Sequence, residues 1–66
     1  MRLKCQRDFR MVDGTLAFRS GHEYEWRWAT QEEEAELGEM GPIYAFTSEL
    51  GEEHFMSYSD VEAAFA

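Results

Sequence analysis

The sequence predicts a small, mainly β domain built as a small β-barrel, and three observations favour this class. Short segments that alternate apolar and polar residues recur along the chain between turn signals, which is typical of half-buried strands. The length of 66 residues makes a single domain, 1–66. Five Phe, three Tyr and two Trp supply the large buried area per residue that so small a core needs. Cys5 is the only cysteine, so an internal disulfide is excluded.

The N-terminal third contains two predicted strands separated by turn signals. The stretch RLKCQRDF, residues 2–9, alternates with Leu3 and Cys5 on one face, and it predicts one half-buried strand. Asp13-Gly14 then marks a turn. The stretch LAFRSG, residues 16–21, predicts the next strand, which ends at a second turn.

The clearest predicted strand is HEYEWRWAT, residues 22–30. Its alternation places three aromatic side chains on one face, and two acids and a base on the other. The aromatic face would carry Tyr24, Trp26 and Trp28, and the polar face Glu23, Glu25 and Arg27. Aromatic residues at this period favour a strand.

The acidic stretch that follows, about residues 30–38, predicts a short helix inserted after the strand. Thr30 and Glu33 have the spacing of a capping box, and Gly38 is placed to end the helix. Leu37 would then fold back on the domain while the glutamates face water. A mobile acidic loop is the alternative, because a helix of two turns is marginal on its own.

The C-terminal third predicts a hairpin and a helix. Residues 43–58 would form two strands that turn around Gly51. The tail SDVEAAFA, residues 59–66, predicts a short helix that Ser59 or Asp60 would cap. Val61 and Phe65 lie four residues apart, on one face of that helix.

Residues 14–26, GTLAFRSGHEYEW, resemble the diverging-turn segment of SH3-like barrels. The whole chain resembles small phage and prophage proteins of this barrel type. The matching positions are Lys4, Cys5, Asp8, Phe9, Leu16, Phe18, Ser20, Gly21, Glu23, Tyr24, Gly51, Glu53, His54, Met56 and Phe65. The resemblance implies one SH3-like barrel of about five short strands, with the acidic stretch as an insertion and a short terminal helix.

The net charge of −8 is unevenly distributed along the chain. Residues 1–20 hold five bases and two acids, a net charge of +3, whereas residues 21–66 hold Arg27 against twelve acids, a net charge of −11. A surface this acidic repels phosphates and anionic lipid. We therefore expect no direct nucleic-acid binding and no membrane binding. With no signal-peptide pattern and no apolar run long enough to span a bilayer, the expected location is the cytoplasm, or the host cytoplasm if a phage encodes the protein.

Residues with catalytic or metal-binding chemistry are few and scattered. Cys5 is predicted to be a buried small hydrophobe, and no histidine lies near it in sequence. His22 would lie in a turn and His54 at the rim of a strand. Neither a phosphate-binding loop nor a metal-ligand spacing occurs. We therefore expect no enzyme activity, no cofactor and no metal site.

A protein-binding surface is the remaining functional prediction. It would combine aromatic and acidic residues, with the aromatic groups giving affinity and the acids selecting a partner with a basic surface. Its predicted residues are Trp26, Trp28, Glu32, Glu33, Glu34, Glu36 and Glu39. The protein would then be a phage-type inhibitor or modulator that acts in the manner of a DNA mimic on a host nucleic-acid-acting enzyme or a defence complex.

Three alternatives stay open at this point. All three aromatic residues of the strand at 22–30 could belong to the core. The domain could be a structural module that forms a homodimer through a barrel edge or the Trp face. It could also bind proline-rich peptides in an aromatic groove, with Phe9 and Tyr58 as groove residues.

Overall fold

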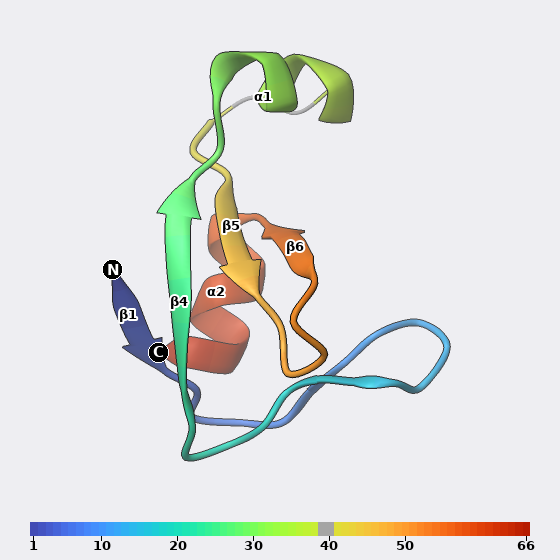
Figure 1. The fold of residues 1–66 in the computed structure, drawn as a ribbon, viewed down its shortest axis with the longest axis vertical. Helices are drawn as coiled ribbons and strands as arrows, with labels where there is room; N and C mark the ends of the chain where they lie inside the picture. The colour runs from blue at the N-terminus through green and yellow to red at the C-terminus, as the bar shows by residue number, and fades with distance from the viewer. Residues whose placement is uncertain (39–40) are drawn as a thin grey trace.

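The computed structural model describes residues 1–38 and 41–66, and it is mainly β, as predicted. Along the described residues the elements are β1 (Arg2–Lys4), β2 (Phe9–Arg10), β3 (Leu16–Phe18), β4 (Glu23–Trp28), α1 (Gln31–Leu37), β5 (Tyr44–Thr47), β6 (Glu53–Met56) and α2 (Tyr58–Phe65). Figure 1 shows α1 beyond one end of β4, away from the rest of the domain, and α2 against the sheet.

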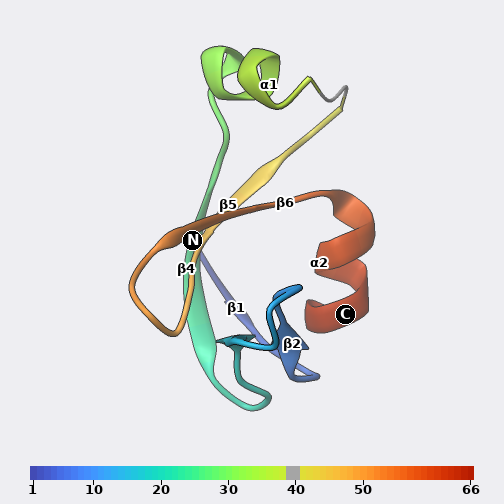
Figure 2. The same ribbon diagram turned by 90° about the vertical axis from the view of Figure 1, so that its right-hand side faces the viewer.

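Four antiparallel strands form the main sheet in the order β1-β4-β5-β6. The register pairs Leu3 with Tyr24, and Trp26 with Phe46. The predicted hairpin at 43–58 is confirmed, since β5 and β6 are antiparallel neighbours with Phe46 opposite His54. Figure 2 shows the sheet nearly edge-on, with α2 on one side of it. We call the side that α2 covers the inner face.

The strands described by the structure form two separate sheets and no closed barrel, so the predicted small barrel of about five strands is not confirmed. The predicted single strand at 2–9 is wrong, because it is interrupted between β1 and β2. The backbone N–H groups of Gln6 and Arg7 both donate to the Ala64 carbonyl, at 2.7 and 3.2 Å. The last carbonyls of a helix lack hydrogen-bond donors within the helix. The segment after β1 supplies such donors to the end of α2. The Cys5 N–H still donates to the His22 carbonyl, and the Cys5 carbonyl accepts from the Gly21 N–H. After Cys5 the chain leaves this partner, and it next forms the β2–β3 ribbon.

The core is centred on Phe18, which is fully buried. Its ring contacts the rings of Phe9 in the ribbon, Tyr24 in the sheet and Phe65 in α2, with centroid distances of 6.0, 5.0 and 5.3 Å. The first contact is tilted and the other two are edge-on, and aromatic contacts of this kind add to the hydrophobic gain of burial. Phe18 thus joins the ribbon, the sheet and the helix in a single core.

The C-terminal helix is confirmed, but its predicted cap is wrong. Ser57, not Ser59 or Asp60, is the N-cap, and its side chain accepts a hydrogen bond from the Asp60 N–H. The helix therefore begins directly after β6, because a serine one residue past the strand already supplies the cap. Val61 and Phe65 are both buried, as their spacing predicted.

Replacing Phe18 by alanine is expected to lower the free energy of unfolding by about 3–5 kcal/mol, since it opens a cavity where three parts of the fold meet. Urea unfolding followed by far-UV circular dichroism measures this loss. Val12→Ala is the control, because the Val12 side chain is fully exposed and its removal should cost less than about 0.5 kcal/mol. A Phe18→Ala protein as stable as the wild type would contradict the central place of this ring.

Candidate functional site

Exposure rises along the inner face of β4 towards α1. Tyr24 is buried at 7% exposure, Trp26 is partly buried, and Trp28 is 50% exposed. Phe65 of α2 lies near Tyr24, at 6.3 Å between ring centroids. The three aromatic residues therefore do not all belong to the core, and Trp28 is the one that reaches the surface.

Trp26, Trp28 and Tyr44 pack together, and we call these three residues the aromatic cluster. The centroids of Trp26 and Trp28 are 4.9 Å apart, and that of Tyr44 lies 4.7 Å from Trp28 and 5.1 Å from Trp26. Because each ring contacts the other two, Trp28 is held in place although half of it faces solvent. The Trp26 Nε1 atom is buried and has no hydrogen-bond partner within residues 1–38 and 41–66.

The acidic stretch forms a helix, as predicted, and both of its ends are capped. The Thr30 side chain accepts a hydrogen bond from the Glu33 N–H at 3.2 Å, and the Glu33 carboxylate accepts one from the Thr30 N–H at 2.8 Å. At the other end Gly38 has a φ of 67°, and its N–H donates to the carbonyls of Glu34 and Ala35. A positive φ suits glycine, which has no Cβ to clash.

Leu37 does not fold back on the domain, so that prediction is wrong. Its side chain is 44% exposed, and none of the residues of α1 is buried. A helix with no buried face gains little from packing, so its stability must come from its caps and from the contacts at its base. In Figure 1 α1 accordingly lies apart from the sheet.

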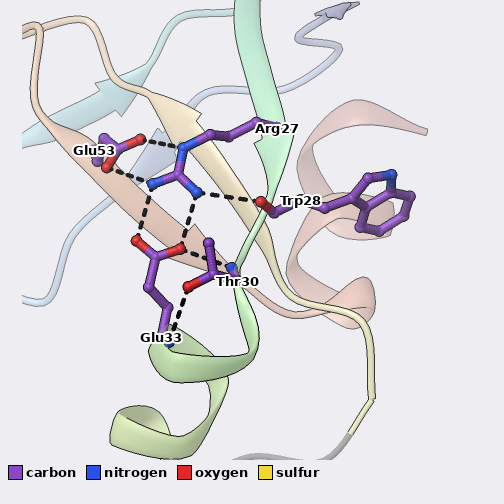
Figure 3. Close-up of polar contacts among 5 residues, drawn as sticks. All are labelled: Arg27, Trp28, Thr30, Glu33 and Glu53. Atoms are coloured by element: carbon purple, nitrogen blue, oxygen red, sulfur yellow. Dashed lines mark hydrogen bonds and ion pairs between the residues drawn. The ribbon is translucent and has the colours of Figure 1, made fainter.

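Arg27 makes the contacts at the base of α1. It lies on the side of the sheet opposite the inner face, which we call the outer face (Figure 3). Its Nη1 and Nη2 atoms donate to the two carboxylate oxygens of Glu33, both at 2.9 Å. Its Nε and Nη2 atoms donate to the carboxylate of Glu53 in β6, at 3.0 and 2.9 Å. A guanidinium group can hold two carboxylates in this way because its donors form a planar fork. Arg27 thereby ties α1 to β4 and β6.

The charges in this arrangement stabilise one another. Hydrogen bonds from Arg27, followed by the backbone N–H of Thr30, lower the pKa of Glu33 from 4.5 to about 2. The hydrogen bonds with Glu33 and Glu53 raise the pKa of Arg27 in turn. Glu33 was predicted to face a partner, but its charge is already compensated within the protein.

The other predicted acids have different environments. Glu32 and Glu36 are exposed on α1, and Glu34 is partly buried. None of these three carboxylates forms an ion pair with a described residue. Glu39 lies outside the described residues. The structure therefore brings Trp26, Trp28 and three uncompensated glutamates of α1 to the same end of β4.

The thiol of Cys5 is not suited to nucleophilic chemistry. It is fully buried, as predicted, and its Sγ donates to the Arg7 carbonyl at 2.9 Å. Burial raises the pKa of this thiol, which disfavours the reactive thiolate.

His54 is partly buried, with its ring 5.9 Å from Phe9 and 5.8 Å from Phe18. In the described part of the chain, no three His, Cys, Asp or Glu side chains are grouped so that they could hold a metal ion.

The two residues predicted for a peptide groove lie in different places. Phe9 lines an open apolar groove along the ribbon, together with Arg10, Met11, Val12, Asp13 and His54. Tyr58 does not line this groove, because it lies at the first position of α2.

Two residues of this region were not among the predicted site residues. Tyr44 completes the aromatic cluster, and its alternation with Phe46 in the predicted strand could have indicated the inner face. Arg27 holds α1, and the available signal was its position as the lone base among twelve acids in residues 21–66. A base in such surroundings is expected to be paired.

No family model, no curated protein and no solved structure matches this chain. The resemblance to SH3-like phage proteins therefore stays a prediction. Among the described residues, neither helix has the length and apolar character that crossing a membrane requires.

The low pKa of Glu33 predicts an acid-sensitive contribution to stability. Because the folded-state pKa lies below the ordinary value, the contribution is complete above pH 4.5 and is lost as the pH falls towards about 2. We expect Glu33→Gln to lower stability at pH 7 and to flatten the fall in stability over this interval. Urea midpoints measured across the pH range test this.

Glu36→Gln is the matched control, because Glu36 is an exposed glutamate of the same helix without an ion pair among the described residues. Its acid profile should follow that of the wild type. If Glu33→Gln and the wild type lost stability in parallel on acidification, the assignment of this sensitivity to Glu33 would be refuted.

Proposed function

We propose that the protein is a non-enzymatic protein-binding module that recognises a basic surface on its partner through the end of β4. The partner would be a host protein that handles nucleic acid, or a defence complex, and binding would inhibit or modulate it. The recognition surface consists of the aromatic cluster and the uncompensated glutamates of α1: Glu32, Glu34 and Glu36.

The observation that carries this proposal is a helix that is well formed but contributes nothing to the core. Both ends of α1 are capped and its base is held by Arg27, yet none of its residues is buried. An element of this kind has little role in folding the rest of the domain. What α1 does provide is a cluster of carboxylates held in a defined position. This favours a role in recognition.

Trp28, which lies at the same end of the domain and is half exposed, is a second argument for a contact surface there. Aromatic residues are enriched at protein interfaces and often contribute a large part of the binding energy. The glutamates would add long-range attraction that speeds association with a basic partner. A surface of this composition would compete with nucleic acid for a basic binding site.

The non-enzymatic class is supported by the buried, high-pKa thiol of Cys5. We also propose that the domain is an SH3-like phage-type protein, on the basis of its resemblance in residues 14–26. The β4-β5-β6 meander and the terminal helix are consistent with that assignment.

Neutralising Glu32 and Glu36 together to glutamine is expected to reduce capture of the partner. The tagged wild type and this double variant would be used to capture proteins from a bacterial lysate, with the bound proteins identified by mass spectrometry. For the protein captured, association should be several-fold slower with the variant at low salt, and the difference should shrink at high salt as the charges are screened.

Glu23→Gln combined with Glu52→Gln is the matched control, because it removes the same charge at exposed positions away from α1. Equal slowing by both pairs would show that only net charge matters, and would refute a specific role for α1. Capture of the protein itself and nothing else would favour the self-associating module instead.

A further inference from the structure

The first turn of α2 follows closely after the strand that pairs with Tyr44 of the aromatic cluster. Tyr44 pairs with Met56 at the end of β6, and α2 begins two residues later with Tyr58. The Tyr58 side chain is 60% exposed. Glu62 lies four residues further along, so it shares a helix face with Tyr58. Interaction with the Glu62 carboxylate raises the pKa of the Tyr58 hydroxyl, and the nearby Tyr44 hydroxyl adds to this effect.

This surface therefore combines ring faces with a carboxylate, but it has no cation of its own among the described residues. Arg27 points to the opposite side of β4 from Trp28 (Figure 3), where it is bound to two carboxylates. Arg2 and Lys4 lie opposite Glu25 and Glu23, which places them on the same outer face as Arg27.

The remaining bases belong to other parts of the fold. Arg7 donates to carbonyls at the C-terminal end of α2, at the other end of that helix from Tyr58. Arg10 lies in the ribbon, where it donates to the Gly14 carbonyl, and Arg19 lies 3.9 Å from Glu49. A cation attracted to the rings must therefore come from another molecule.

We propose that the surface formed by Trp28, Tyr44, Tyr58 and Glu62 binds an arginine side chain of the partner protein. The face of an aromatic ring attracts a cation, and tryptophan attracts it most strongly. A guanidinium is flat and weakly hydrated, so it stacks on such a ring better than an ammonium does and can also donate to a carboxylate. This inference rests on the proposed function, because it names the group on a basic partner that the aromatic cluster recognises.

The three-way packing of the cluster makes it suitable for this role. Trp26 contacts Trp28 edge-on, with ring planes at 89°, and so supports it from the side of the core. The exposed ring is thus fixed before a ligand arrives, which reduces the entropy lost on binding.

The test compares two peptides of equal charge, tetra-arginine and tetra-lysine, followed by tryptophan fluorescence and by the indole N–H signals in NMR spectra. The wild type should bind tetra-arginine more tightly than tetra-lysine and should show its largest shift at the Trp28 indole. Trp28→Leu should weaken tetra-arginine binding about two- to fivefold, because it keeps an apolar side chain but removes the ring face. Trp26 remains as the reporter in that variant.

Leu50→Ala is the control, since Leu50 is an exposed apolar residue in the turn at the other end of β5. It should bind both peptides as the wild type does, and thermal unfolding would show that each variant is folded. Glu62→Gln should weaken tetra-arginine binding and reduce its dependence on salt. Equal affinity for the two peptides, or an unchanged affinity in Trp28→Leu, would overturn the arginine site.

Capture of the partner by the double variant at Glu32 and Glu36, compared with capture by Trp28→Leu, distinguishes failure of the arginine site from failure of the proposed function. If that variant loses the captured partner while Trp28→Leu keeps it, the acidic helix binds and the arginine site is wrong. If neither change affects capture, both proposals fail. Loss of capture in Trp28→Leu, together with a preference for tetra-arginine, supports both.

Discussion

The alternation of side chains along β4 is the constraint on which the rest of the structure depends. Successive residues of a strand point to opposite faces, so one six-residue strand delivers two chemically different surfaces. The inner face supplies Tyr24 to the core and Trp28 to the surface. The outer face supplies Arg27, which holds α1 in place. A shift of one residue in the register with β1 and β5 would bury the charges and expose the aromatic rings.

Competition for backbone hydrogen bonds decides the shape of the domain. The segment after Cys5 could have continued along the sheet, but the amides of Gln6 and Arg7 both donate to the Ala64 carbonyl at the end of α2 instead. The guanidinium of Arg7 adds hydrogen bonds to the same helix end. The cost is a sheet that does not close over the described residues, and the gain is a terminal helix anchored at its C-terminus. Phe18 then packs the separated ribbon back onto the core.

The uneven charge of the chain has a local consequence as well as a global one. In the acidic part of the sequence the only base is engaged by two carboxylates, and this binding fixes the position of α1. With Arg27 engaged there, none of the described residues places a cation on the aromatic side of the sheet. Arg27 thus positions the acidic helix from the outer face, whereas the rings of Trp26 and Trp28 lie on the opposite face of β4.

The sequence by itself determined the elements that depend on local chemistry. The period-two alternation predicted β4 and the β5–β6 hairpin, and the spacing of Thr30, Glu33 and Gly38 predicted the capped helix α1. These features could be recognised because the groups that stabilise them lie within a few residues of one another. The burial of Cys5 followed in the same way from its place in an alternating segment.

Only the tertiary structure decided the features that depend on residues far apart in the chain. The break between β1 and β2 arises from an acceptor at Ala64, which no local pattern near residue 6 could indicate. Trp28 and Leu37 are both exposed, and no residue of α1 is buried, which the local sequence pattern did not indicate. The pairing of Arg27 with Glu53 spans 26 residues. Long-range packing and hydrogen bonding, which the folded chain alone specifies, therefore decided which of the predicted site residues are available to a partner.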